Sequence, residues 1–165
     1  MNEVEKNSTE AAEVFNHKIK IQQSQGSILS ETIWIMIDQI KHYEERLNYQ
    51  WDSADLAEQL EKDTKIVVID TRKTFAFEEE HIPSAVNFPH RTMNEKNTAT
   101  LNKDMLYICY CDGIGCNGST KGALKMAELG FNVRELIGGL DWWKRDGYET
   151  EGEQATKGLK IECAC

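Results

Sequence analysis

Residues 107–121 read Tyr-Ile-Cys-Tyr-Cys-Asp-Gly-Ile-Gly-Cys-Asn-Gly-Ser-Thr-Lys. A β-prone run ends at Cys111, a glycine-rich loop follows, and a helical pattern begins near Thr120. Glycines let successive backbone N–H groups turn inward as an anion nest, and a helix N-terminus adds partial positive charge beside them. A cysteine at this place is expected to have a lowered pKa and to act as a nucleophile near neutral pH. The stretch therefore predicts a reactive thiolate at Cys111, and the alternative is a buried strand cysteine beside a tight turn.

Apolar runs typical of buried strands lie on both sides of this stretch and alternate with helical patterns. The strand-like runs are residues 66–69, 85–88 and 131–137, and the helical patterns between and after them are residues 53–61, 75–80, 120–129 and 140–146. Strands separated by helices predict an α/β fold with an open, mostly parallel sheet covered by helices on both faces. Cys111 then lies at the carboxyl end of a strand, where such sheets place their ligands.

The N-terminal region predicts an amphipathic helix outside this α/β pattern. Ile33, Ile37 and Ile40 follow a capping Ser30 at helical spacing. Such a stripe packs either on the chain's own domain or, through residues 28–47, in a homodimer. The sequence thus predicts three parts: a helical extension over residues 1–47, an α/β domain over residues 48–150, and a flexible polar tail over residues 151–165.

Composition argues against several classes of partner. The 165 residues carry a formal net charge of −9, which disfavours the basic surface that nucleic acid or an anionic membrane requires. No apolar run approaches the length of a membrane span, and residues 1–10 lack an apolar signal segment, so we expect a cytoplasmic protein. Five cysteines, an odd number, favour thiol chemistry or metal binding over a disulfide framework.

Four motifs in sequence order resemble the successive signatures of a rhodanese domain. They are Ile-Asp-Thr-Arg at residues 69–72, Glu-His-Ile-Pro-Ser-Ala-Val-Asn-Phe-Pro at residues 80–89, Cys111 with its loop, and Gly-Gly-Leu-Asp-Trp-Trp at residues 138–143. More narrowly, the loop resembles that of single-domain bacterial rhodaneses with an extended two-cysteine loop. The resemblance implies an α/β sulfurtransferase fold in which Cys111 carries a persulfide.

Two positions depart from the common pattern of that family. The usual loop has one cysteine and an arginine about five residues further on, whereas this chain has Cys116 and Asn117 there. The missing arginine weakens any expectation of thiosulfate specificity. It also argues against the activity of related phosphatases, because Asn117 cannot supply a charged bidentate fork for phosphate. The second departure is Glu80, where glycine commonly precedes His-Ile-Pro, and we expect only a local effect.

The candidate site follows from these motifs. Cys111 is the predicted nucleophile, with Cys116 as its rival. Asp70 and Arg72 are expected to brace the mouth of the site, or else to form an exposed pair of little consequence. The substrate-binding loop is predicted to comprise Asp112, Gly113, Ile114, Gly115, Cys116, Asn117 and Gly118.

The remaining cysteines and histidines receive other roles. Cys116 either resolves a persulfide or sulfenate into a disulfide or packs as a small residue under the loop. Cys163 and Cys165 form a tail dithiol that relays sulfur or a solvated terminus without function. Cys109 is expected in the core and His81 in a structural role. His90 and Arg91 follow Pro89 and are candidates to face the pocket.

These observations predict an enzyme that moves sulfane sulfur through a persulfide on Cys111. The donor is a small molecule of the thiosulfate or persulfide type, and the acceptor is a thiol or cyanide. No cofactor, metal, nucleic acid or membrane is expected to take part. One alternative is a non-catalytic rhodanese-like module that senses thiols or binds a partner, and another is a thiol-ligated metal protein.

Overall fold

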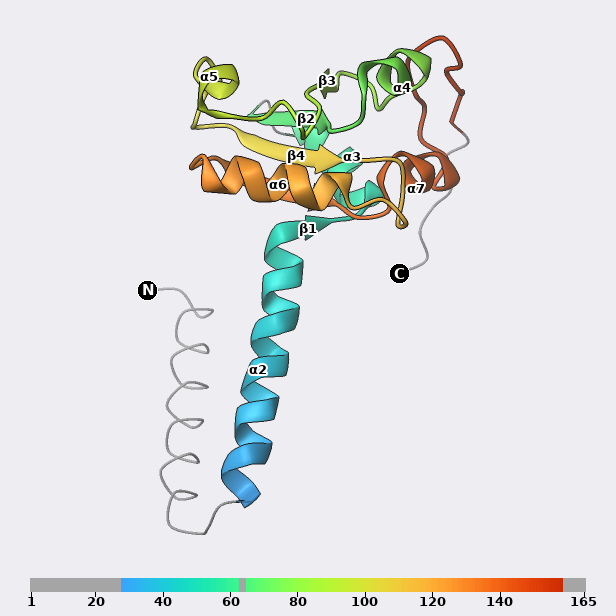
Figure 1. The fold of residues 1–165 in the computed structure, drawn as a ribbon. Coiled ribbons are helices and arrows are strands. Elements are labelled where there is room, and N and C mark those ends of the chain that lie inside the picture. The colour runs from blue at the N-terminus through green and yellow to red at the C-terminus, as the bar shows by residue number, and fades with distance from the viewer. Residues whose placement is uncertain (1–27, 63–64, 159–165) are drawn as a thin grey trace. The chain divides into compact units, whose positions relative to one another are not determined.

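The computed structural model describes residues 28–62 and 65–158 (Figure 1). The chain divides into two compact units, residues 1–46 and residues 47–165. The predicted relay cysteines Cys163 and Cys165 lie outside the described residues. Among the helices of the described ranges, none is long and apolar enough to cross a membrane.

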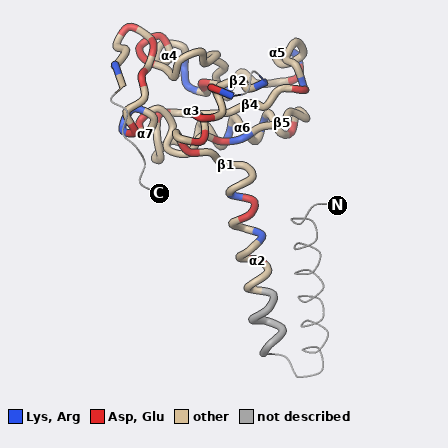
Figure 2. The backbone as a smooth tube through the Cα atoms, turned by 180° about the vertical axis from the view of Figure 1, so that it is seen from behind, with Lys and Arg blue, Asp and Glu red and all other residues tan. Residues whose placement is uncertain are grey.

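The described part of the first unit belongs to helix α2, Ile28–Tyr49, which confirms the predicted N-terminal helix. Both acidic and basic residues lie along it (Figure 2), and Lys41 pairs with Glu45 at 3.7 Å. Ile37 is half-buried and Ile40 is exposed, whereas the side chain of Ile33 is outside the described set. A homodimer through residues 28–47 stays a prediction.

The second unit is built on a five-stranded sheet in which every pair of neighbours is parallel (Figure 1). The spatial order is β1-β5-β4-β2-β3. The strands are β1 Gln50–Trp51, β2 Ile66–Asp70, β3 Val86–Asn87, β4 Leu106–Tyr110 and β5 Asn132–Leu136. The predicted open, parallel α/β sheet is thus confirmed, with β4 at its centre.

Alternating side chains of β4 enter two separate core clusters on the two faces of the sheet. Ile108 and Tyr110 pack in the cluster of Leu56 and Trp143, which come from α3, Ser53–Lys62, and α7, Gly139–Arg145. Tyr107 and Cys109 pack in the other cluster, with Met126 of α6, Gly118–Glu128. The predicted core position of Cys109 is confirmed. Because each fully buried apolar side chain contributes about 1.5–3 kcal/mol, this two-sided burial fixes the register of β4.

Two short helices complete the unit, α4 at Thr74–Glu79 and α5 at Glu95–Thr98. Helix α5 falls in a polar segment between two strands, where the sequence shows no helical pattern. Its N-cap is Asn94, whose side chain accepts a hydrogen bond from the Asn97 N–H at 3.1 Å. A helix of one turn shows no hydrophobic period, which is why periodicity misses it.

The segment after α7 is bound to the domain over residues 151–154. The backbone of Glu151 exchanges two hydrogen bonds of 2.8 Å with His81, and the N–H groups of Glu153 and Gln154 donate to carbonyls of α4. The structure thus differs from the predicted flexible tail beginning at residue 151. These contacts use backbone groups, which a polar sequence does not reveal.

Candidate active site

Cys111 follows the last residue of β4 and is 4% exposed. Its carbonyl accepts a hydrogen bond from the Leu140 N–H at 3.0 Å, and the Asp112 carbonyl accepts one from the Asp141 N–H at 2.8 Å. Gly139 has φ +57°, and a Cβ there would overlap the Cys111 carbonyl. The start of α7 therefore holds the backbone on one side of the loop, and only glycine permits this approach.

Gly118, the first residue of α6, lies directly against the sulfurs of the loop. A Cβ built on Gly118 would stand 2.6 Å from Cys111 Sγ and 3.4 Å from Cys116 Sγ. The first N–H groups of a helix lack partners within it, and the helix dipole makes that end partially positive. The first turn of α6 carries no acidic residue to offset this field. The position therefore favours a thiolate at Cys111.

The predicted anion nest is wrong for this form of the loop. None of Gly113, Gly115 and Gly118 has a positive φ, which a nest of alternating backbone conformations requires. The Cys116 N–H instead donates to the Gly113 carbonyl at 2.9 Å, which closes a turn. The helix N-terminus, brought close by Gly118, is the positive element that remains.

Cys111 and Cys116 are joined in a disulfide, with their Cα atoms 6.3 Å apart. The structure thus brings together the predicted nucleophile and its rival. Cys109 is the free cysteine among the described residues. Burial, and to a smaller extent the nearby Glu135 carboxylate, raises the pKa of Cys109 to about 12, so this thiol stays protonated.

The same loop contains a cluster of donor atoms that bears on the metal-protein alternative. Cys111, Asp112 and Cys116 each offer a ligand atom, and these atoms lie within 4.8 Å of one another. In the disulfide form, however, neither sulfur is a thiolate, which is the species that binds metal. In this form the cluster therefore offers a metal no thiolate ligand.

Asp70 and Arg72 connect the end of β2 to the loop. Arg72 Nη2 donates to Asp70 Oδ2 at 2.7 Å and to the Glu80 carbonyl at 2.6 Å, and Nη1 donates to Asp112 Oδ1 at 3.1 Å. Burial by itself lowers the pKa of Arg72, but the hydrogen bonds and the charge of Asp70 raise it well above its usual value. The geometry is that of a brace, and the functional role of the pair stays a prediction.

Tyr110, the last residue of β4, supports the same pair from within the sheet. Its hydroxyl hydrogen-bonds Asp70 and accepts the Ile82 N–H at 3.2 Å. Burial and the negative charge of Asp70 raise the pKa of Tyr110 far above its usual value, so the hydroxyl remains a donor. Arg72 and Tyr110 together thus supply hydrogen bonds to the buried Asp70 carboxylate.

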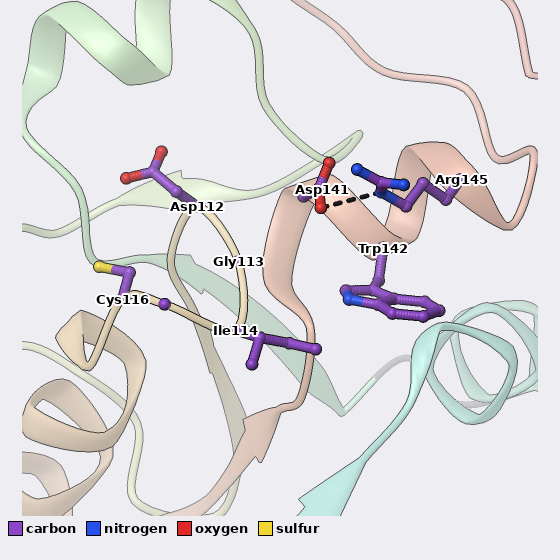
Figure 3. Close-up of a pocket in the computed structure, with 8 residues that line it drawn as sticks. Asp112, Gly113, Ile114, Cys116, Asp141, Trp142 and Arg145 are labelled. Atoms are coloured by element: carbon purple, nitrogen blue, oxygen red, sulfur yellow. Dashed lines mark hydrogen bonds and ion pairs between the residues drawn. The ribbon is translucent and has the colours of Figure 1, made fainter.

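A pocket of about 580 Å³ opens beside the loop (Figure 3). Ile114 and Trp142 extend toward the same space, whereas Asp112 lies on the opposite side of the loop (Figure 3). The residues that line this pocket are Asp112, Gly113, Ile114, Gly115, Cys116, Asp141, Trp142 and Arg145. Five of the seven predicted loop residues therefore line the pocket. Of the other two, Asn117 occupies the N-cap position of α6 without a side-chain capping hydrogen bond, and Gly118 is buried beneath the sulfurs.

Sequence reasoning missed Asp141 and Arg145, which lie one helical turn apart on α7 and pair at 2.9 Å. The Gly138-Gly139 motif was the available signal, because it places the first turn of α7 against the loop. Gly138 has φ +81° and the Trp142 ring lies directly over it. Trp143, by contrast, belongs to the core.

A second pocket, of about 340 Å³, shares Asp112 and Asp141 with the first and is also lined by Arg72, Glu80 and Lys144. Glu80 accepts hydrogen bonds from Lys144 and from Thr150 Oγ1, the latter at 2.8 Å. Burial by itself raises the pKa of Glu80, but these hydrogen bonds lower it below its usual value. Glu80 thus has a local role: its carboxylate joins α7 to the segment that follows this helix.

His81 and His90 line neither of these pockets. His81 stacks on Phe77 with ring centres 3.8 Å apart, and its Nδ1 lies 2.7 Å from the Phe77 carbonyl. The His90 N–H donates to the Thr71 carbonyl at 3.1 Å, and burial, then the charge of Arg91, lowers the pKa of His90. Neither His90 nor Arg91 lines either pocket.

A parallel sheet whose central strand delivers a cysteine to a helix N-terminus defines an α/β protein with a loop-borne thiol. A family model, the rhodanese-like domain, matches residues 53–146. The thiosulfate sulfurtransferase GlpE of Coxiella burnetii is 34% identical over 112 residues, covering 67% of this chain and 90% of the relative. The chain belongs to the rhodanese-like domain family, which supports sulfurtransferase activity in general.

Solved structures agree with this assignment. The BH2092 protein of Bacillus halodurans is 40% identical with a TM-score of 0.69, covering 77% of this chain and 93% of that one. A rhodanese-related protein of Thermoplasma volcanium is 27% identical with a TM-score of 0.56, covering 64% of this chain and 99% of that one. Both relatives are thus covered over nearly their whole lengths.

Proposed function

We propose that this protein is a sulfurtransferase that carries sulfane sulfur as a persulfide on Cys111. The observation that carries the proposal is the position of Cys111 Sγ against Gly118 at the N-terminus of α6. There the partial positive charge of the helix N-terminus stabilises a thiolate. The GlpE relative is named a thiosulfate sulfurtransferase, which gives the class of reaction.

The reaction begins from the reduced loop. The Cys111 thiolate attacks the outer sulfur of a donor such as thiosulfate, the S–S bond of the donor breaks, and sulfite leaves. The outer sulfur is now bonded to Cys111 Sγ as a persulfide. A thiol or cyanide acceptor then attacks that outer sulfur and returns Cys111 as the thiolate. We expect this cycle to run in the cytoplasm, where thiols are kept reduced.

The residues around Cys111 would hold the loop during both steps. The hydrogen bonds from Leu140 and Asp141 fix the backbone of the loop, and Arg72 restrains Asp112. The pocket between Ile114 and Trp142 is wide enough for a small donor or a thiol acceptor. Because the family arginine is absent, we expect no strong preference for the doubly charged thiosulfate over an uncharged or singly charged persulfide.

The test compares two matched serine variants. Reduced wild type, Cys111→Ser and Cys116→Ser are treated in parallel with thiosulfate and with glutathione persulfide, and sulfite release and intact mass are followed. We expect Cys116→Ser to gain about 32 Da, the mass of one sulfur, and Cys111→Ser to gain none. A gain in Cys111→Ser with an inert Cys116→Ser would assign the nucleophile to Cys116.

A thiol-sensing module is the second candidate, because the Cys111–Cys116 disulfide is also what such a module would form. The two functions differ in turnover. A sulfurtransferase releases sulfite or glutathione repeatedly when an acceptor is present, whereas a sensor changes only between dithiol and disulfide. Repeated turnover with cyanide as acceptor supports the enzyme, and a single oxidation without sulfur transfer supports the sensor.

A further inference from the structure

The loop holds two cysteine sulfurs at one helix N-terminus, and the sulfur-transfer cycle above uses only one of them. We propose that Cys116 attacks Sγ of the Cys111 persulfide, expels the outer sulfur as hydrosulfide and closes the Cys111–Cys116 disulfide present in this structure. An external dithiol then reduces the disulfide. The inference rests on the proposed function, because it starts from the persulfide, and it adds a second activity, the reductive release of sulfide.

The backbone geometry allows this step without movement of the sheet. The Cα atoms of the two cysteines are 6.3 Å apart, within the range that disulfides span. The loop is fixed by α7 at Cys111 and Asp112, and by the turn from Gly113 to Cys116. Two thiols held this way have an effective concentration far above that of a free thiol acceptor. Cys116 therefore competes well with any external acceptor for the persulfide.

Atoms and electrons balance in the release step. The bond between Cys111 Sγ and the outer sulfur breaks, a bond between the Sγ atoms of Cys111 and Cys116 forms, and the outer sulfur leaves as hydrosulfide with its electron pair. The outer sulfur is reduced and the two cysteines are oxidised. The proton of the Cys116 thiol goes to solvent.

Exposure assigns the sulfur at which the disulfide is reopened. Cys116 is half-buried and lines the pocket beside Ile114 and Trp142, whereas Cys111 is almost fully buried. A dithiol in that pocket therefore attacks Cys116 and displaces the Cys111 thiolate, which the N-terminus of α6 stabilises as a leaving group. The second thiol of the dithiol then resolves the mixed disulfide. In sum, thiosulfate and a dithiol give sulfite, hydrosulfide, a disulfide and a proton.

Another described cysteine does not fit this role. Cys109 lies in the core cluster of α6, and its raised pKa of about 12 keeps it from forming a thiolate. The tail cysteines Cys163 and Cys165 remain as competitors for the resolving role, and the experiment has to separate them from Cys116.

The experiment uses the full chain, reduced and then freed of reductant, with the donor that loads the Cys116→Ser protein. Sulfide and intact mass are measured before any thiol is added. We expect wild type to release sulfide in an amount equal to its persulfide and to end about 2 Da lighter than the reduced protein. Cys116→Ser should keep its extra sulfur and release at least about tenfold less sulfide. Added dithiothreitol should then restore repeated sulfide release in wild type.

The matched control is the double variant Cys163→Ser/Cys165→Ser, which changes the same chemical group outside the loop. It should behave as wild type. The inference is overturned if wild type keeps the extra sulfur without releasing sulfide, if Cys116→Ser releases sulfide as wild type does, or if the tail variant abolishes release. A Cys116→Ser protein that no donor loads would overturn the proposed function, and this inference with it.

Discussion

Two arginine–aspartate pairs lie near the cysteine loop, one joined to Asp112 through Arg72 and the other lining the pocket beside the loop. The Arg72–Asp70 pair has side chains 7% and 0% exposed, and the Arg145–Asp141 pair has side chains 66% and 53% exposed. Arg72 also reaches the Glu80 carbonyl and Asp112, so its donors are divided among three partners. Arg145 Nε, by contrast, donates to one carboxylate in its own helix.

The difference shows that the same two residue types affect stability more when the pair is buried than when it is exposed. A buried charge that loses its partner remains desolvated and strongly destabilises the fold. An exposed charge that loses its partner is hydrated by solvent at little cost. We therefore predict that the buried pair braces the loop, whereas the exposed pair contributes little to stability. The following predictions test this contrast.

Arg72→Met should give the largest effect, because it leaves the Asp70 carboxylate buried without its cation. We expect the free energy of unfolding to fall by about 3–5 kcal/mol, measured by urea denaturation. Arg72→Lys is the matched control, since it keeps the charge and loses the planar guanidinium. Its free energy of unfolding should lie between those of wild type and Arg72→Met. A loss below about 1 kcal/mol in Arg72→Met would contradict the brace.

Gly118→Ala tests the same contrast between buried and exposed positions at a glycine. Its methyl group would press against Cys111 Sγ, whereas the matched Gly115→Ala would meet nothing within 4 Å. We expect Gly118→Ala to cost about 1–3 kcal/mol of stability and to slow persulfide formation at least about tenfold. Equal rates in the two alanine variants would show that the approach of α6 to the sulfur is unimportant.

Glu80→Gln should produce a smaller, pH-dependent effect. The folded-state pKa of Glu80 lies below the usual 4.5, so its carboxylate stabilises the fold above that pH and loses this contribution as pH falls through the folded pKa. Near neutral pH we expect the variant to be less stable by about 1 kcal/mol. The gap in melting temperature between wild type and variant should narrow below pH 4.5. A difference in melting temperature that widens below pH 4.5 would show that the ionised Glu80 carboxylate does not stabilise the fold.

Arg145→Gln should give the smallest effect. The exposed pair one helical turn apart is expected to contribute about 0.3–0.5 kcal/mol, and salt should screen it further. Urea denaturation at low and at high salt measures the contribution of the pair to stability and its screening. A loss comparable to that of Arg72→Met would remove the distinction between the two pairs.

Much of the fold could be predicted because the central strands β2 and β4 are largely buried. Continuous apolar runs such as residues 66–69 leave little doubt about a central strand, and the glycine loop at Cys111 marks where the chain leaves the sheet. Helix α5 could not be predicted because one turn carries no periodicity. The pairing of residues 151–154 could not be predicted for a different reason, because it depends mainly on backbone groups.

The candidate site was predictable where residue type determines the chemistry. Cys111, Cys116, Asp70 and Arg72 could be named from the motifs. The backbone conformation of the loop could not, because glycine is compatible with many φ values and its role at residue 118 is close approach. Asp141 and Arg145 belong to a helix whose contact with the loop arises only from the tertiary fold.

The hydrogen bonds of Glu80 also bear on where this protein can be divided. The family match ends at residue 146, yet Thr150 and Thr156 both donate to the Glu80 carboxylate, whose backbone carbonyl in turn accepts from Arg72. The unit that folds around the thiol therefore extends about ten residues beyond the unit that sequence comparison recognises. A fusion or truncation made at the family boundary would cut through the support of the site, whereas one made beyond Thr156 would leave that support intact.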